Sequence, residues 1–168
     1  ERRRADLVAT LAEVVGAYQT APHGAAAVDW QGPETPLVLE IDAKLLGRAV
    51  RNLIENAVRV SPAEATVEVR LDTSGDEAVI RVADRGPGVE PELLGKIFDP
   101  YFSTHDTGTG LGLPIARRIA ESHGGSMRAR NRQSGGLEVS IRLPLSGEGF
   151  DAAADSSPAA AEPGGSAG

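Results

Sequence analysis

The sequence predicts an α/β fold in which a mixed, mainly antiparallel β-sheet packs against helices on one face, as a two-layer sandwich. Three stretches, residues 5–18, 43–60 and 113–123, repeat apolar side chains at helical spacing. Two others, residues 66–83 and 127–143, alternate apolar and polar side chains around a turn, which is typical of antiparallel hairpins. Because a sheet with one apolar face must bury it against amphipathic helices, this order of elements favours a layered sandwich.

Composition narrows the class of protein. At 168 residues the chain suits one domain with appendages, and with 40% hydrophobic but only 4% aromatic residues its core must be aliphatic. There is no cysteine, hence no disulfide framework and no thiol chemistry. No apolar run approaches the ~20 residues that cross a membrane, and no signal peptide is visible. The net charge of −7 gives no reason to expect a nucleic-acid partner. Since the chain starts with Glu1 and not with Met, we expect a piece of a longer protein.

The chain divides into three predicted units. Residues 1–20 carry a helical apolar face, and two interpretations stay open: a connector from an upstream domain, or an ordinary helix of the same domain. Residues 21–145 form the main domain. Residues 146–168 consist of Ala, Gly, Ser, Pro, Phe and acids. They bury too little apolar area to offset chain entropy, so we expect this tail to be disordered.

A long helix follows two short strands, at residues 28–30 and at residues 37–41, of which the second reads as buried. Asp42 is its expected N-cap, and Ser61-Pro62 ends it because the residue before proline avoids helical backbone angles. Its apolar stripe consists of Leu45, Leu46, Ala49, Val50, Leu53, Ala57 and Val60.

Two asparagines, Asn52 and Asn56, share one face of this helix because they are four residues apart. Asparagine is a poor residue inside a helix, since its amide competes for backbone hydrogen bonds. An amide oxygen is a ligand that Mg²⁺ accepts when nucleotide phosphates supply most of the others. The pair therefore indicates either a metal site or a solvated surface.

A hairpin is predicted next. Its first strand has Val67, Val69 and Leu71 facing inward, its turn is at Ser74-Gly75, and its second strand covers residues 78–83. It ends in the run Asp-Arg-Gly-Pro-Gly from Asp84 to Gly88. A buried carboxylate at a strand end can accept a hydrogen bond from an exocyclic amine such as that of adenine, and the glycines let the backbone pass close to a base. The alternative is an ordinary turn after a strand.

A glycine run precedes the last helix. After a short helix expected at residues 90–97, residues 98–113 read FDPYFSTHDTGTGLGL, with residues 105–109 as a polar lid. The glycines stand at the N-terminus of the helix at residues 113–123, where free N–H groups and the dipole favour phosphate. A flexible turn is the alternative. His123 is expected to cap this helix at its C-terminus.

In this order, the motifs resemble the ATP-binding domain of sensor histidine kinases, in the GHKL ATPase superfamily. The N box NLIENAVRVSP starts at Asn52, the first glycine box DRGPG at Asp84, the F box IFDPYFST at Ile97 and the second glycine box GTGLGL at Gly108. The resemblance covers roughly residues 28–144. The F box and the run ESHGG look most like the nitrogen-regulation subgroup of these kinases.

The resemblance implies the histidine kinase ATPase fold and a protein-histidine kinase that uses ATP and Mg²⁺. Asn56 is then the Mg²⁺ ligand, and Asp84 binds the adenine amine. Asn52 stands where hydrolytic relatives carry a glutamate base, so water would be poorly activated and the γ-phosphoryl group kept for a histidine. Arg59 stands where lysine is usual and would reach a phosphate, with Glu55 competing for it as an ion-pair partner.

The other residues that the resemblance implies at the nucleotide belong to the glycine loops and the lid. They are Gly86, Gly88, Val89, Phe98, Phe102, His105, Thr107, Gly108, Thr109, Gly110, Leu111, Gly112 and Leu113. Three positions depart from the family pattern: Val60 where an aromatic residue often covers adenine, Leu137 where threonine is common, and His105 where the similar subgroup often has lysine.

The resemblance also implies partners. None of the three histidines has the sequence context of a phosphoacceptor, so the acceptor is expected on dimerisation helices of the same full-length protein. A response regulator receiver domain would follow, the full-length protein would be a homodimer, this fragment a monomer, and its location the cytoplasmic part of a possibly membrane-bound sensor. Two alternatives stay open: a nucleotide-binding regulatory module without phosphotransfer, and an anti-sigma-factor serine kinase, which the F box and Asn52 disfavour.

Overall fold

The computed structural model describes residues 1–19, 25–100, 102 and 111–145. A five-stranded mixed sheet forms one layer, in the order β2-β4-β5-β7-β6. Its only parallel pair among the described residues is β2 with β4, and the other neighbours are antiparallel. The strands are β2 (Ala27–Gln31), β4 (Thr66–Ser74), β5 (Glu77–Ala83), β6 (Ser126–Asn131) and β7 (Leu137–Pro144).

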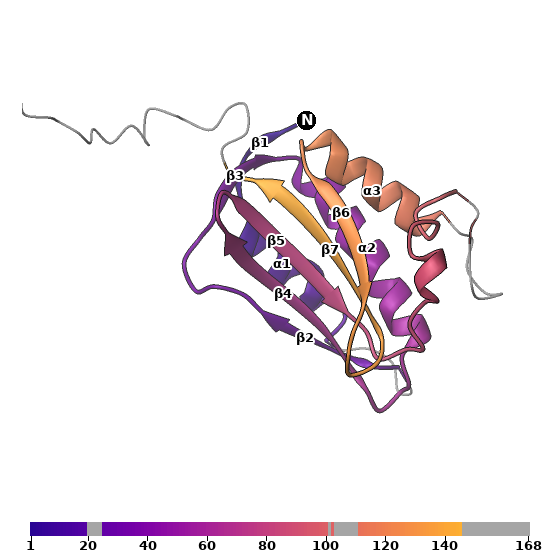
Figure 1. Cartoon of the computed structure of the whole chain (residues 1–168). Coiled ribbons are helices and arrows are strands. Elements are labelled where there is room, and N and C mark those ends of the chain that lie inside the picture. Colours follow the sequence, from indigo (N-terminus) through magenta and orange to yellow (C-terminus); the bar gives the residue numbers. More distant parts are fainter. Residues whose placement is uncertain (20–24, 101, 103–110, 146–168) are drawn as a thin grey trace, which may run out of the picture.

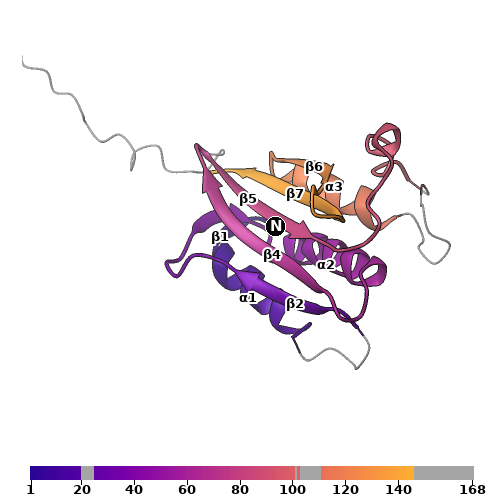
Figure 2. The ribbon, with the colours of Figure 1, turned by 60° about the horizontal axis from the view of Figure 1, so that its bottom comes forward.

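Three helices form the second layer: α1 (Leu7–Gly16), α2 (Ala43–Val60) and α3 (Gly112–Ser122). All three lie on one face of the sheet, with α2 and α3 side by side (Figures 1 and 2). The predicted two-layer α/β sandwich is therefore confirmed, as are the hairpin β4–β5 and the pair β6–β7.

The core is aliphatic, as the composition predicts, because the alternation of each strand brings apolar side chains into rows across the sheet. Leu71 of β4 lies opposite Ile80 of β5, which lies opposite Ile141 of β7. None of the three is more than 2% exposed. The other face of the sheet carries ion pairs, for example between Arg81 and Asp72 at 2.9 Å.

The N-terminal segment differs from the expected helix at residues 5–18. Arg3–Asp6 is a strand, β1, which pairs antiparallel with β3 (Val38–Ile41) in a separate two-stranded sheet. The helix starts only at Leu7 because Asp6 caps it, accepting the Val8 N–H at 3.0 Å. β3 is not the buried strand expected, since alternate residues face outward and Val38 is 42% exposed.

Helix α1 packs into the same hydrophobic core as the main sheet, through Leu7, Leu11, Val14 and Val15. This burial favours the interpretation of α1 as a helix of the domain. The division at residue 20 stays a prediction, because residues 20–24 lie outside the described part, as does the tail at residues 146–168.

Helix α2 begins and ends as the sequence predicts, with Asp42 accepting the Leu45 N–H at 3.1 Å and Ser61 at the C-cap. The predicted burial of one residue in the apolar stripe is wrong: Leu45, in the first turn, is 39% exposed. The helix expected at residues 90–97 is also wrong, since only a 3₁₀ turn forms, η1 (Pro91–Leu93). Gly95 is a poor helix former, which disfavours extending this turn into a longer helix. Within the described residues, no helix is long and apolar enough to span a membrane.

Candidate functional site

Three segments that are distant in sequence carry the predicted site residues: helix α2, the loop after β5 and the start of α3 (Figure 1). The amide of Asn52 joins two of them, donating a hydrogen bond of 3.3 Å to the carbonyl oxygen of Gly112. The N box and the end of the second glycine box therefore meet, with Leu111 and Leu113 on either side of Gly112 half-buried at this helix start.

Asp84 is a buried carboxylate at the end of β5, only 4% exposed. Its Oδ1 accepts two backbone hydrogen bonds, from the N–H groups of Gly86 and Leu137, each 2.9 Å long. The Asp84 N–H in turn donates to the Leu137 carbonyl at 2.9 Å. Two donors on one oxygen fix the direction of the carboxylate, as a group that must meet a ligand in one orientation requires.

Glycine is required at two positions around Asp84 because backbone passes too close for a side chain. A Cβ on Gly86 would lie 2.8 Å from the carbonyl oxygen of Val60 at the end of α2. A Cβ on Gly136 would lie 2.0 Å from the Asp84 carbonyl oxygen, and Gly136 has φ of +101°, which other residues rarely adopt. The loop after β5 is thus held tightly between α2 and the β6–β7 turn.

On α2, Asn56 and Arg59 face each other, and an Arg59 Nη2 N–H donates to Asn56 Oδ1. The expected competition from Glu55 is not present. Glu55 instead accepts a hydrogen bond of 2.9 Å from the hydroxyl of Tyr18, which follows α1. Burial, and then this hydrogen bond to Glu55, raise the pKa of Tyr18 to about 12, so the hydroxyl is a donor at neutral pH.

The donor set on α2 suits a magnesium ion held jointly with a nucleotide. Asn56 has a neutral amide oxygen of the kind that Mg²⁺ accepts, but the Arg59 guanidinium donates to it and would have to turn away before a cation could bind. The part of the chain that the structure describes contains no group of three His, Cys, Asp or Glu side chains that would hold a metal alone. Phosphate oxygens would therefore have to complete the coordination of Mg²⁺.

The F-box phenylalanines are half-buried and pack against the core. The guanidinium of Arg117, on α3, lies 5.6 Å from the centre of the Phe98 ring, a cation–π distance. Phe98 therefore joins the loop before α3 to α3 itself, and Phe102 continues that contact with the core. The lid and phosphate residues predicted next lie outside the described residues: His105, Thr107, Gly108, Thr109 and Gly110.

His123 stands at the C-cap of α3 as predicted, but it acts through hydrogen bonds of its ring and not through a positive charge at the helix dipole. The ring is 6% exposed, its Nδ1 lies 2.8 Å from the Ile119 carbonyl oxygen, and its Nε2 accepts the Asp42 N–H at 2.9 Å. A carbonyl needs a donor and an N–H needs an acceptor, so the ring is neutral with its proton on Nδ1. It links the C-terminus of α3 to the N-terminus of α2.

Two residues that no sequence motif predicts hold the loop after β5 from the other side. Asn131 accepts the Val89 N–H at 2.8 Å and donates to the Val89 carbonyl at 2.6 Å. Arg132 donates to the Asp84 carbonyl at 2.9 Å. The only sequence signal near these residues is the glycine pair Gly135-Gly136, which is typical of any turn between two strands.

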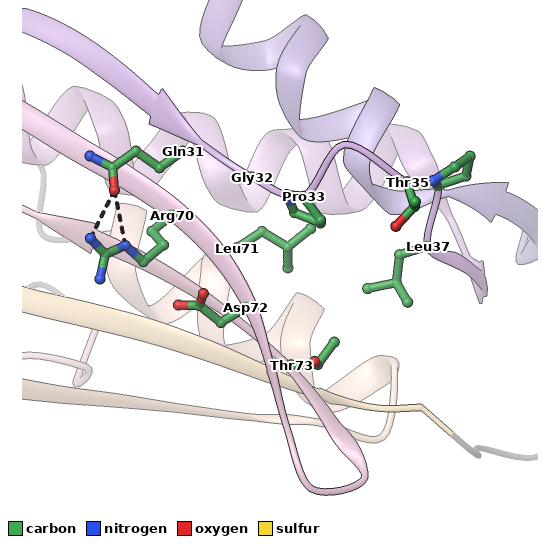
Figure 3. Close-up of a pocket in the computed structure, with 10 residues that line it drawn as sticks. Gln31, Gly32, Pro33, Thr35, Leu37, Arg70, Leu71, Asp72 and Thr73 are labelled. Atoms are coloured by element: carbon green, nitrogen blue, oxygen red, sulfur yellow. Dashed lines mark hydrogen bonds between the residues drawn. The ribbon is translucent and has the colours of Figure 1, made fainter.

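A cavity of about 550 Å³ lies elsewhere, between the end of β2 and the edge of β4 (Figure 3). Gln31 and Arg70 face each other at one side of it, with the Gln31 side-chain oxygen accepting from Arg70 Nη2 at 2.8 Å. Pro33, Leu37 and Leu71 form its apolar wall. None of the predicted site residues lines this cavity, so it is separate from the candidate site.

The sandwich, with the N box against the second glycine box and a buried carboxylate at the end of β5, defines an ATPase domain of the GHKL type. Residues 41–147 match the model of the family described as histidine kinase-, DNA gyrase B-, and HSP90-like ATPase. The chain belongs to this family. The predicted superfamily is thereby confirmed, while the nitrogen-regulation subgroup stays a prediction.

Similar proteins are sensor kinases. The chain is 40% identical over 117 residues to the sensor histidine kinase GtrS of Pseudomonas aeruginosa, covering 68% of this chain and 23% of that protein. It is 35% identical over 155 residues to the sensor protein CutS of Streptomyces coelicolor, covering 86% of this chain and 36% of that protein. The chain thus spans only about a quarter to a third of these relatives.

Solved structures of histidine kinases have a similar fold. The mycobacterial sensor histidine kinase MprB superposes with a TM-score of 0.74 at 28% identity, covering 86% of this chain and 97% of that one. The catalytic domain of histidine kinase ThkA gives a TM-score of 0.77 at 26% identity, covering 86% and 96%. The chain therefore has the fold of a histidine kinase catalytic domain over nearly its whole described length.

Proposed function

We propose that this domain binds ATP with Mg²⁺ and donates the γ-phosphoryl group to a histidine on dimerisation helices outside this chain, as the catalytic part of a two-component sensor histidine kinase. The observation that carries the proposal is the buried Asp84 carboxylate, oriented by two backbone N–H groups at the end of β5. A fixed acceptor beside glycine backbone suits the amine of adenine, which is a hydrogen-bond donor.

The residues divide between the two ends of the nucleotide. Asp84, with Gly86, Gly88 and Val89, would hold the base. Asn56 would offer its amide oxygen to Mg²⁺, which when bound neutralises charge on the phosphate oxygens. Arg59 already lies against this oxygen, so its guanidinium would be close enough to turn to a phosphate.

Asn52 favours transfer over hydrolysis. Its amide donates to the Gly112 carbonyl and has no basic atom, so it would not take a proton from water. The γ-phosphoryl group would then stay on ATP until an imidazole nitrogen attacks it. The new P–N bond forms as the bond between the γ-phosphorus and the β-phosphate oxygen breaks, and ADP leaves. His105, Leu111, Leu113 and the glycines between them would surround the phosphates.

The acceptor histidine is expected from another domain. His123 is buried, and both ring nitrogens have partners in the fold, so neither is available to a phosphoryl group. The dimerisation helices of the same protein, a response regulator receiver domain further on, and a cytoplasmic location belong to the same proposal. The sensor kinases that resemble this chain support it.

Calorimetry of the domain with ATP, in Mg²⁺ and in EDTA, tests the binding step. Asn56→Ala should lose most of the Mg²⁺-dependent gain in affinity and keep the affinity measured in EDTA, because it removes a metal ligand and no base contact. Leu45→Ala, an exposed change on the same helix, is the matched control. An Asn56→Ala variant with the full Mg²⁺ gain would contradict the metal assignment.

Labelled ATP tests transfer. The domain alone should not label itself, and adding dimerisation helices from a histidine kinase of this type should give acid-labile label on their histidine. A domain that binds ATP but labels no such helices, including its own upstream ones, would instead be a nucleotide-binding regulatory module.

A further inference from the structure

We infer that the β6–β7 hairpin is part of the nucleotide site and fixes its base selectivity, with Arg132 as the positioning residue of Asp84 and Asn131 as that of the Val89 backbone. This inference rests on the proposed function. Both residues stand where β6 ends and the turn to β7 begins. Neither needs to touch the nucleotide, since each acts through the loop that would.

The hairpin forms hydrogen bonds with both ends of the loop after β5. At the first end, Arg132 Nη1 donates to the Asp84 carbonyl oxygen at 2.9 Å, and Leu137 N–H donates to the carboxylate of the same residue at 2.9 Å. At the other end, the amide of Asn131 makes a reciprocal pair of hydrogen bonds with Val89, as another backbone strand would. The loop between these points is short and glycine-rich, so its path is set by them.

Arg132 is itself held in place. Its Nη2 donates to Glu68 Oε2 of β4 at 3.0 Å, and its side chain is only 16% exposed. The guanidinium thus connects β4, the neighbour of β5 in the sheet, to the backbone of Asp84 at the end of β5. The planar guanidinium has its donors at fixed angles and is suited to this, whereas the lysine ammonium is a compact charge on a flexible stem without that fixed geometry.

Rigidity at Asp84 has a chemical consequence for the base. A carboxylate only accepts hydrogen bonds. It attracts the amine at position 6 of adenine and repels the carbonyl oxygen at that position in guanine. This discrimination depends on the carboxylate keeping its direction, because a carboxylate that can turn away no longer excludes guanine. The groups that hold Asp84 therefore determine selectivity as well as affinity.

The experiment compares the affinities of ATP, ADP and GTP for the parent domain and for Arg132→Gln. Arg130→Gln is the matched control, since Arg130 lies on β6 two residues before Arg132 and likewise pairs with a glutamate, but its side chain is 73% exposed and its partner Glu138 is on β7, not in the loop. Arg132→Gln should lower the preference for ATP over GTP by roughly tenfold, the value of one charge-assisted hydrogen bond. The preference for ATP over ADP should not change, because the phosphate end is untouched.

Arg132→Lys should recover part of the ATP preference, since it restores one donor. Glu68→Gln is a second variant that removes only the charge orienting Arg132, and it should shift the preference in the same direction at little cost in folding. A folded Arg132→Gln or Glu68→Gln domain with the parent's ratio of ATP to GTP affinity would overturn the inference. A parent domain that binds no ATP would instead refute the proposed function, so the two failures are distinguishable.

Discussion

Replacing Asp84 by asparagine changes one atom of the predicted base contact and tests the site assignment directly. In the parent, Oδ1 accepts the N–H groups of Gly86 and Leu137, both at 2.9 Å. The amide oxygen of asparagine can take over both bonds, so the loop keeps its path. The amide nitrogen then replaces the second carboxylate oxygen and presents a donor where adenine presents one too.

The expected losses in ATP affinity and in folding stability follow from these contacts. Losing a charge-assisted hydrogen bond to the adenine amine costs about 1.5–3 kcal/mol, which is roughly ten- to a hundredfold in ATP affinity. Folding should suffer less, by about 1 kcal/mol, because the bonds from Gly86 and Leu137 lose their charge assistance but keep an acceptor. Asp84→Ala should differ. It leaves two backbone N–H groups without that acceptor and should lower the free energy of unfolding by about 2–4 kcal/mol.

Calorimetry with ATP and GTP, together with thermal unfolding, measures both effects. Asp84→Asn should weaken ATP binding and improve GTP relative to ATP, since the new donor suits the guanine carbonyl. Equal ATP affinity in Asp84→Asn and the parent would refute the reasoning that Asp84 contacts the base. An Asp84→Asn domain as unstable as Asp84→Ala would refute the account of the loop.

Three further variants test the scaffold and its link to the candidate site, and a fourth prediction concerns pH. His123→Ala breaks the link between α3 and α2 and should cost about 2–4 kcal/mol, a fall of roughly 10 °C in Tm by calorimetry, against a negligible fall for the exposed change Leu45→Ala. Gly136→Ala forces a Cβ against the Asp84 carbonyl at positive φ and should cost about 3 kcal/mol or more in urea unfolding, whereas Gly75→Ala, with open space around it, should cost less. Tyr18→Phe frees Glu55 to pair with Arg59 and should weaken Mg-ATP binding, an effect absent from Tyr18→Phe/Glu55→Gln. Because the folded pKa of Tyr18 is raised to about 12, the contribution of its hydrogen bond to stability should be complete below pH 10 and lost as pH rises through 12.

The elements with strong periodicity were predictable because their signal is local. The cap at Asp42, the stop at Ser61-Pro62 and the β4–β5 hairpin depend on residues a few positions apart, and each agrees with the structure. The β1–β3 ribbon was not predictable in this way. Its partners are more than 30 residues apart, and β1 carries two arginines that give no strand signal.

The same distinction holds at the candidate site. Asp84 and Asn56 could be identified as site candidates because each stands in a short motif whose residue types and spacing indicate its chemistry. The hydrogen bonds from Arg132 and Asn131 to the loop span about 40 to 50 residues, and an arginine at a strand end reads as surface charge. Arg59 shows the opposite error, since helical spacing predicted a pair with Glu55 but tertiary contact with Tyr18 takes that carboxylate away.

Helices α2 and α3 are tied together at two levels, and this explains why the motifs need their scaffold. His123 joins the end of α3 to the start of α2, and Asn52 joins the middle of α2 to Gly112 at the start of α3. The helices therefore run antiparallel, and the N-terminus of α3 lies level with the N box. An N-terminus held there directs its free N–H groups to the side of the domain that carries Asn56 and Arg59. The proposed roles of the glycines and of Asn56 therefore depend on the alignment of α2 and α3, to which the buried His123 at the far end contributes.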